Sequence, residues 1–274
     1  MAIVDMILHS EVLNLDEEIA VLLPETRRGY EKLTEKKYPV VYVLHGYKEN
    51  HLAWIRKSNI EEIAKKLECI VVMPACKNSF YVDSKTGFNY MKYLVEELPI
   101  KIANFFPASI KKEDTYIMGA SMGGYAAFNI ALNNPDKYAA AASFSGVVGL
   151  DFDDGLFSKV DVKMNEQLRA IFGSREEYLN SDNYLKRKIL EFDKLKDQPR
   201  LYMCCGTDDF LYNVNNEFID YVKENTSVEI TYETSSGQHD YFFWNKYIER
   251  AFDFFGIKQL STYSNIDGID IHRV

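Results

Sequence analysis

Residues 115–124 read Thr-Tyr-Ile-Met-Gly-Ala-Ser-Met-Gly-Gly, and this stretch decides the fold. Residues 115–118 are β-branched, aromatic or apolar, and they predict a short buried strand. A segment rich in small residues follows over residues 122–132 and predicts a helix. The pentapeptide between them fits the pattern G-x-S-x-G, which places a serine on a sharp turn between a strand and a helix. The stretch therefore predicts a nucleophile elbow centred on Ser121.

Steric crowding around the serine explains the two glycines of the pentapeptide. A serine on such a tight turn has a strained backbone, and Gly119 and Gly123 leave room for its close neighbours. The turn lifts the serine hydroxyl out of the sheet, and the helix N-terminus directs backbone amides toward developing negative charge. A small-residue turn needed only for packing is the alternative. The position between a buried strand and a helix favours a catalytic Ser121.

Strand-like and helical segments alternate on both sides of this turn. Strand-like runs, most of them apolar, cover residues 39–44, 69–73, 138–144, 201–205 and 228–232. Helical spacing covers residues 58–67, 90–105, 214–222 and 241–254. Apolar strands separated by helices predict an α/β fold with a mostly parallel central sheet and helices on both faces. Two alternating runs near the N-terminus, residues 2–8 and 19–23, suit antiparallel edge strands.

One segment interrupts this alternation. Residues 146–198 are charged, and they have helical spacing only in patches, at 166–172 and 184–192. Because the segment lies between two core strands, we expect an insertion over one end of the sheet. The sequence contains no internal repeat, low-complexity segment or linker. We therefore expect residues 1–274 to form a single domain with a lid-like insertion at about 146–198.

The composition excludes several partners. The chain has 274 residues, with 32 Lys and Arg against 41 Asp and Glu, and a formal net charge of −9. This acidic balance argues against nucleic-acid binding, which needs a basic face. No apolar run approaches the roughly 18–20 residues that span a bilayer, so no membrane partner is expected. The N-terminus lacks a basic region and Asp5 interrupts its apolar residues, which predicts a cytoplasmic protein without a signal peptide.

The cysteines and aromatic residues indicate no cofactor. Cys69, Cys76, Cys204 and Cys205 match no zinc-binding spacing, and buried reduced thiols are expected instead. We predict neither a metal nor another cofactor. The 19 Tyr and 17 Phe exceed what one pocket can use, so a homo-oligomer is expected.

A serine nucleophile needs a base, and in the chain order Ser, acid, His the histidine lies downstream. Two histidines follow Ser121. His272 is the third residue from the end of the sequence, whereas His239 lies between a predicted strand and the last predicted helix. Because sites of α/β proteins assemble in loops at the carboxyl ends of strands, His239 is the predicted base.

The acid and the oxyanion donors come from two further loops. Asp208 and Asp209 both follow the predicted strand at 201–205; only one can face His239, and we favour Asp209. One oxyanion donor is the amide of Met122, directly after the nucleophile, and the other is expected in the loop after an early strand. That loop is 45–47, which makes the amide of Tyr47 the second candidate.

Three more side chains have alternative interpretations. His45 is expected to order its loop by a hydrogen bond rather than to act as the base. Trp54 follows this loop and is predicted to line the substrate pocket, with ordinary packing as the alternative. Trp244 lies in the first turn of the last predicted helix, where core packing is favoured.

At this level of detail the sequence resembles the esterase D-type α/β-hydrolases, and within them the tributyrin esterase family of bacterial carboxylesterases. The resemblance runs through most of the chain. The matching segments, in the family's order, are Leu44-His45-Gly46, Asn50-His51 with Trp54, and residues 71–74, 80–83, 87–88, 96–99, 121–125, 142–146, 205–212 and 237–239. Residues 146–198 depart most from related members, and we expect them to set acyl and alcohol selectivity.

The resemblance implies a cofactor-free serine esterase that hydrolyses short-chain acyl esters through an acyl-enzyme. It supports Asp209 as the acid, and the amides of Tyr47 and Met122 as oxyanion donors. The wider group also includes S-formylglutathione hydrolases, feruloyl and acetyl-xylan esterases, and mycolyltransferases, so the substrate stays open. A non-enzymatic α/β-hydrolase scaffold is the alternative of a different class, and the intact Ser, Asp and His argue against it.

Overall fold

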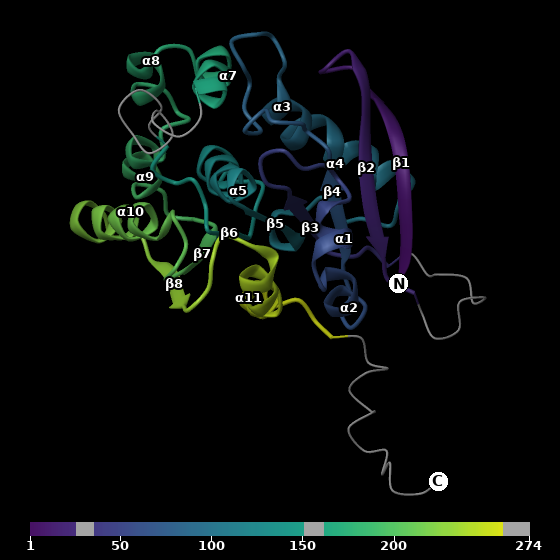
Figure 1. Ribbon diagram of the computed structural model, residues 1–274. Coiled ribbons are helices and arrows are strands. Elements are labelled where there is room, and N and C mark those ends of the chain that lie inside the picture. Colours follow the sequence, from purple (N-terminus) through teal and green to yellow (C-terminus); the bar gives the residue numbers. More distant parts are fainter. Residues whose placement is uncertain (26–35, 151–161, 260–274) are drawn as a thin grey trace, which may run out of the picture.

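The computed structural model describes residues 1–25, 36–150 and 162–259. In this part of the chain, eight strands form one sheet with the order β1-β2-β4-β3-β5-β6-β7-β8 (Figure 1). The strands are β1 (Ala2–Ser10), β2 (Leu15–Leu23), β3 (Val40–Leu44), β4 (Ile70–Pro74), β5 (Thr115–Ala120), β6 (Ala140–Phe144), β7 (Arg200–Gly206) and β8 (Ile230–Ser235).

The sheet is mostly parallel, as the apolar runs predict. β3 to β8 run parallel to one another, whereas β2 pairs antiparallel with both β1 and β4. The central strands β3, β4, β5 and β6 are buried along their whole length. Their near-continuous apolar sequence is the consequence of being covered on both faces.

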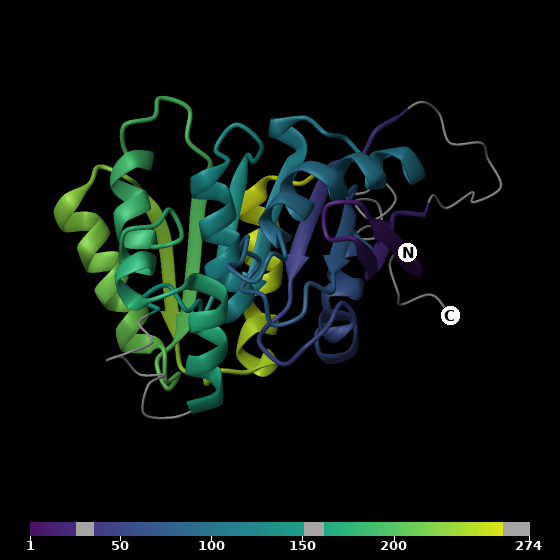
Figure 2. The ribbon, with the colours of Figure 1, turned by 90° about the horizontal axis from the view of Figure 1, so that it is seen from above.

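Helices cover both faces of the sheet (Figures 1 and 2). On one face, a large apolar cluster includes side chains of α4 (Leu98–Phe105), α5 (Met122–Asn133), α9 (Leu185–Phe192) and α10 (Tyr212–Asn225). On the other face, a second cluster includes α1 (Ala53–Lys57), α2 (Ile60–Ala64) and α11 (Tyr241–Phe255). None of the helices within the described ranges is long and apolar enough to cross a bilayer.

The expected helix at 90–105 is not continuous. It divides into α3 (Tyr90–Lys92), a π-helical turn η1 (Tyr93–Glu97) and α4. Pro99 lies in the first turn of α4, where it has no amide hydrogen to donate to the carbonyl of Val95. That carbonyl instead accepts a hydrogen bond from Lys137 Nζ at 3.2 Å. The proline therefore explains the wide turn that the hydrophobic spacing does not reveal.

The expected helix at 58–67 is shorter and follows a separate turn. α1 ends at Ser58, whose amide donates to the carbonyl of Trp54 at 3.0 Å. The Ser58 hydroxyl then accepts from the amide of Ile60, where α2 begins, at 3.2 Å. Ser58 therefore joins two short helices, α1 and α2.

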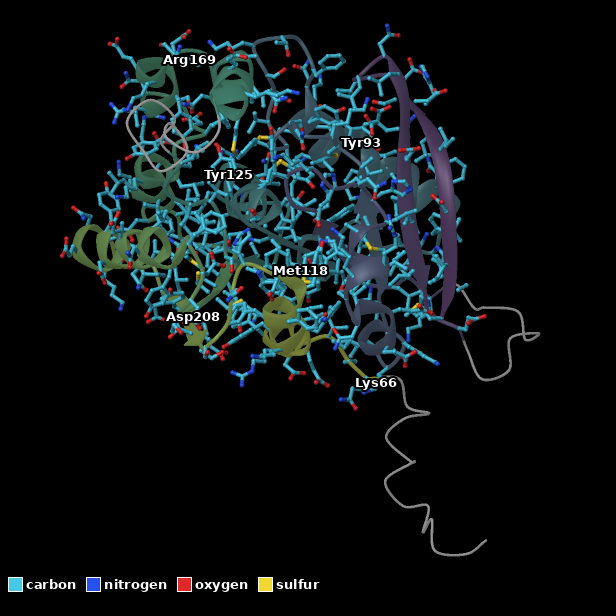
Figure 3. The ribbon with its side chains drawn as sticks, in the orientation of Figure 1. Lys66, Tyr93, Met118, Tyr125, Arg169 and Asp208 are labelled. Atoms are coloured by element: carbon cyan, nitrogen blue, oxygen red, sulfur yellow. The ribbon has the colours of Figure 1, made fainter. Side chains whose placement is uncertain are left out.

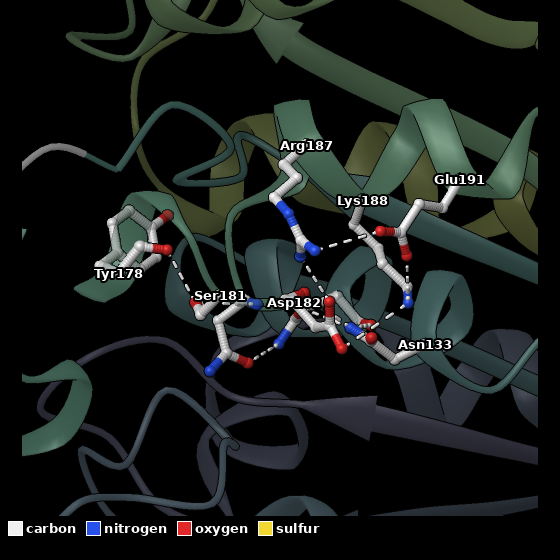
Figure 4. Close-up of polar contacts among 9 residues, drawn as sticks. Asn133, Tyr178, Ser181, Asp182, Arg187, Lys188 and Glu191 are labelled. Carbon is white, nitrogen blue, oxygen red and sulfur yellow. Dashed lines mark hydrogen bonds and ion pairs between the residues drawn. The ribbon is translucent and has the colours of Figure 1, made fainter. Parts of the chain in front are cut away.

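The described part of the insertion packs on the helix that follows Ser121. It contains α7 (Val162–Phe172), α8 (Arg175–Leu179) and α9, and residues 151–161 lie outside the described ranges. Figure 4 shows a polar contact that joins it to α5, in which Asn133 Nδ2 donates to the carbonyl of Asp182 at 3.0 Å. Within the insertion, Arg187 pairs with the Asp182 carboxylate at 2.6 Å. Tyr125, labelled on α5 in Figure 3, donates its hydroxyl to the carbonyl of Asn183 at 2.7 Å.

The four cysteines are buried free thiols, as predicted. Burial raises the pKa of Cys69 to about 12, and burial also raises that of Cys205 to about 12. Thiols with such pKa values remain protonated at neutral pH, so they are poor nucleophiles.

Candidate active site

Ser121 lies on a strained turn between β5 and α5. Its φ of 57° and ψ of −117° are unusual for a residue with a side chain. Its amide donates to the carbonyl of Phe144 at 2.9 Å, which holds the turn against β6. The neighbouring glycines are sterically required: a Cβ at Gly123 would lie 2.3 Å from the carbonyl oxygen of Leu44, and one at Gly119 would lie 2.5 Å from Gly123. The local structure is the nucleophile elbow that the pentapeptide predicts.

Ser121 and His239 line the same cavity, whose volume is about 270 Å³. The cavity lies at the carboxyl end of the parallel strands, where the loops after β3, β5 and β8 meet. Its other lining residues are Gly46, Tyr47, Glu49, Lys57, Asp240, Tyr241 and Trp244. The fold thus brings together residues that are far apart in the sequence.

His239 pairs with Asp209. Its Nδ1 lies 2.9 Å from Asp209 Oδ2 and 3.1 Å from Oδ1. The Asp209 side chain is fully buried and also accepts from the amide of Leu211 at 2.8 Å. Because Nδ1 faces the carboxylate, Nε2 is the ring nitrogen left to exchange a proton with a group in the cavity. The rings of Phe210 and Trp244 pack against the imidazole at centroid distances of 4.6 and 5.2 Å.

Asp208 has a different set of contacts. Its Oδ2 accepts from the hydroxyl of Ser236 at 3.0 Å and from the amide of Gly237 at 3.1 Å. These contacts hold the loop between β8 and α11, which carries His239 (Asp208 is labelled in Figure 3). The structure therefore pairs Asp209, and not Asp208, with the histidine. The alternative histidine, His272, lies outside the described residues.

The two candidate oxyanion donors lie in the loop after β3 and at the start of α5. Met122 is the first residue of α5, and the first amides of a helix have no acceptor within the helix. Tyr47 lines the cavity directly after β3, and its hydroxyl donates to Gln167 on α7. This hydrogen bond connects the loop after β3, which carries the Tyr47 amide, to the insertion.

His45 contacts backbone groups and does not line the cavity. It is buried, and its ring nitrogens contact the carbonyls of Gly46, at 2.8 Å, and of Ala75. Burial lowers the pKa of His45 to about 4, so the ring is neutral at physiological pH. These contacts fit the predicted role of ordering the loop.

Both tryptophans pack in the core, as expected for Trp244 and as the alternative for Trp54, but only Trp244 also reaches the cavity. Trp54 is fully buried and is not among the residues that line the cavity. Its indole Nε1 donates to the carbonyl of Leu44 at 3.0 Å, which turns the ring beneath the end of β3. Trp244 forms part of the cavity wall instead, and its Nε1 donates to Ser145 Oγ at 3.1 Å. The positions of the two tryptophans in the sequence do not reveal which indole N–H donates to a buried carbonyl and which ring reaches the cavity.

Replacing each tryptophan with phenylalanine should distinguish the structural role of Trp54 from the contact of Trp244 with the cavity. Trp54→Phe leaves a buried carbonyl without its donor, so the free energy of unfolding should fall by about 1–3 kcal/mol. Its KM for p-nitrophenyl acetate should stay near the wild-type value, whereas Trp244→Phe should change KM. Urea unfolding and steady-state kinetics measure both effects. A larger KM change in Trp54→Phe than in Trp244→Phe would contradict the placement.

Residues 10–255 match the family described as "Putative esterase". An acetyl esterase from Caldicellulosiruptor saccharolyticus is 29% identical over 261 residues, which cover 92% of this chain and 97% of that protein. The family match includes the segments that carry Ser121, Asp209 and His239.

Solved structures show the same relationship. FphF, a fluorophosphonate-binding serine hydrolase of Staphylococcus aureus solved with substrate bound, is 31% identical with a TM-score of 0.79, over 93% of this chain and 98% of that chain. The S-formylglutathione hydrolase FrmB of Staphylococcus aureus is 29% identical with a TM-score of 0.75, over 93% and 98%. With this sheet and this match to the family, the chain belongs to the esterase D-like family of α/β-hydrolases and is a carboxylic ester hydrolase.

Proposed function

We propose that this esterase hydrolyses short-chain acyl esters through a covalent acyl-enzyme on Ser121. The observation that carries the proposal is the shared cavity, where Ser121 and His239 lie together and His239 is paired with a buried Asp209. A serine hydroxyl is a weak nucleophile until a base takes its proton, and an oriented imidazole is the usual base.

The reaction proceeds in two halves. His239 Nε2 takes the proton of Ser121 Oγ as Oγ bonds to the ester carbonyl carbon, and the amides of Tyr47 and Met122 donate to the resulting oxyanion. Asp209 holds the imidazole orientation and stabilises its protonated form. The C–O bond to the alcohol then breaks, and His239 gives the alcohol its proton. In the second half, water replaces the alcohol in reverse order and releases the acid.

The cavity dimensions support a short acyl group. Its volume is about 270 Å³, and the aromatic residues Tyr47, Tyr241 and Trp244 are among those that line it. We expect kcat/KM for p-nitrophenyl octanoate to be lower than for the acetate or butyrate by at least about 10-fold, since chain atoms that do not fit lose favourable contacts. Steady-state kinetics on the ester series measures this, and equal values along the series would contradict the proposal.

S-formylglutathione hydrolysis is the second candidate, favoured by the similarity to FrmB. The lining charges argue against it, because Glu49 and Asp240 face a single cation, Lys57, among the residues that line the cavity. An anionic thiol ester should therefore be disfavoured relative to a neutral ester. Comparing kcat/KM for p-nitrophenyl acetate, S-formylglutathione, methyl ferulate and acetylated xylo-oligosaccharides decides among the candidates. A preference for S-formylglutathione would replace the first candidate with the second.

A further inference from the structure

Glu49 is a charged residue of the cavity wall that the proposed reaction does not use. Its side chain is only 13% exposed and contacts three different parts of the protein. Oε2 accepts from the amide of Gly46 at 3.0 Å and from the hydroxyl of Tyr241 at 2.8 Å. Oε1 pairs with Lys57 Nζ of α1 at 2.7 Å. The carboxylate therefore joins the loop after β3, the end of α1 and the start of α11.

The same contacts stabilise the charged form of the carboxylate. Burial alone would raise the pKa of Glu49, but hydrogen bonds from Lys57, Tyr241 and Gly46 together lower it below its ordinary value. An uncompensated carboxylate beside a developing oxyanion would slow ester hydrolysis by charge repulsion. Lys57 provides the opposite charge at the carboxylate. The site can thus hold a negatively charged acceptor close to the oxyanion amides.

Two of the hydrogen-bond partners of Glu49, Gly46 and Tyr241, lie next to residues of the proposed mechanism in the sequence. Gly46 precedes Tyr47, whose amide is the second oxyanion donor, and Tyr241 begins α11 two residues after His239. Oxyanion donors act only when their hydrogen atoms point at the position of the oxyanion, so a small rotation of the 46–47 peptide is costly. Oε2 of Glu49 accepts from the amide of Gly46, in the peptide just before the 46–47 peptide, and from the hydroxyl of Tyr241. The same oxygen atom therefore links the loop that carries the Tyr47 amide to the start of α11.

We propose that Glu49 is a positioning residue of this esterase, which fixes the Tyr47 amide relative to His239 so that both act on one tetrahedral intermediate. This inference rests on the proposed function of Ser121. It assigns a role to the acidic side chain three residues after Gly46, within the loop that carries Tyr47.

Glu49→Ala, Glu49→Gln and the control Glu62→Ala test the proposal. Glu62 is an exposed carboxylate of α2, 4.0 Å from Lys65 and outside the cavity lining. In Glu49→Ala, kcat for p-nitrophenyl acetate should fall by about 10- to 100-fold with KM changed by less than about twofold, because the lost interaction acts in the transition state. Glu49→Gln should recover most of the loss, since its amide oxygen can accept from Gly46. Glu62→Ala should match the wild type.

A second readout separates positioning from general stability. The serine adds to a trifluoromethyl ketone to form an adduct that carries an oxyanion. The Ki of this inhibitor should therefore rise in Glu49→Ala by about the same factor as kcat/KM falls. A Glu49→Ala enzyme with wild-type kcat would overturn the proposal. A loss of kcat that follows a lower Tm, leaves the Ki unchanged and is not rescued by Gln would also overturn it. A wild-type chain that neither hydrolyses esters nor reacts with the ketone would instead overturn the proposed function of Ser121, and this inference with it.

Discussion

Ser121→Ala is expected to lower kcat for p-nitrophenyl acetate by about 10⁶-fold, the size of effect seen when a serine hydrolase loses its nucleophile. Alanine keeps the Cβ of Ser121 and the same backbone conformation, so the turn between β5 and α5 should persist. Only the oxygen atom that would carry the acyl group is removed. Steady-state kinetics measures the loss, and circular dichroism with thermal unfolding checks that the fold is intact.

A serine outside the cavity provides the matched control. Ser109 precedes β5 at the opposite end of that strand, and its hydroxyl donates to Asp114 at 2.7 Å. Ser109→Ala removes the same atom at this distant place, so its kcat should equal that of the wild type. Wild-type turnover in folded Ser121→Ala would refute the assignment of the nucleophile.

Asp209→Asn should lower kcat by about 10⁴-fold, because an amide beside Nδ1 no longer enforces the tautomer that leaves Nε2 free to take a proton. The structure makes this an unusually specific test, since the Asp209 side chain is fully buried and lies within 2.9 Å of the imidazole. The substitution preserves the shape of the side chain. Activity at saturating ester concentration across a range of pH values measures the effect.

The neighbouring Asp208 is the natural comparison. Asp208→Asn removes a carboxylate that accepts from Ser236 and Gly237, so it should cost about 1 kcal/mol of stability, the size of a hydrogen bond. Its effect on kcat should be far smaller than that of Asp209→Asn. If Asp208→Asn were the more damaging of the two, the pairing with His239 would be misassigned.

The parts of the fold that depend on short segments could be predicted from the sequence. Ser121 is recognisable because the pentapeptide, the strand before it and the helix after it are contiguous. Asp209 follows the buried strand β7 and His239 follows the edge strand β8, and parallel strands deliver such residues to the same edge of the sheet. The prediction of a mostly parallel sheet, with each residue in a loop after a strand, therefore brings Ser121 and His239 to one edge although they lie 118 positions apart in the chain.

Features that depend on side-chain direction could not be predicted in this way. Trp54 and Trp244 both flank the site in sequence, but the carbonyl of Leu44 directs the first into the core. Glu49 has no signal beyond its offset of three residues from Gly46, and its partners Lys57 and Tyr241 come from separate helices. The π-helical turn before α4 also depends on a side chain. Pro99 has no amide hydrogen for the carbonyl of Val95, and the side chain of Lys137 donates to that carbonyl instead.

Labelling with a fluorophosphonate tests the central claim, that Ser121 is an activated nucleophile, most directly. The wild-type protein and Ser121→Ala are each incubated with the probe, and the adduct is located by peptide mass spectrometry. We predict one adduct, on Ser121, in the wild-type protein and none in Ser121→Ala. A folded wild-type protein without an adduct, or with an adduct on another residue, would contradict the account.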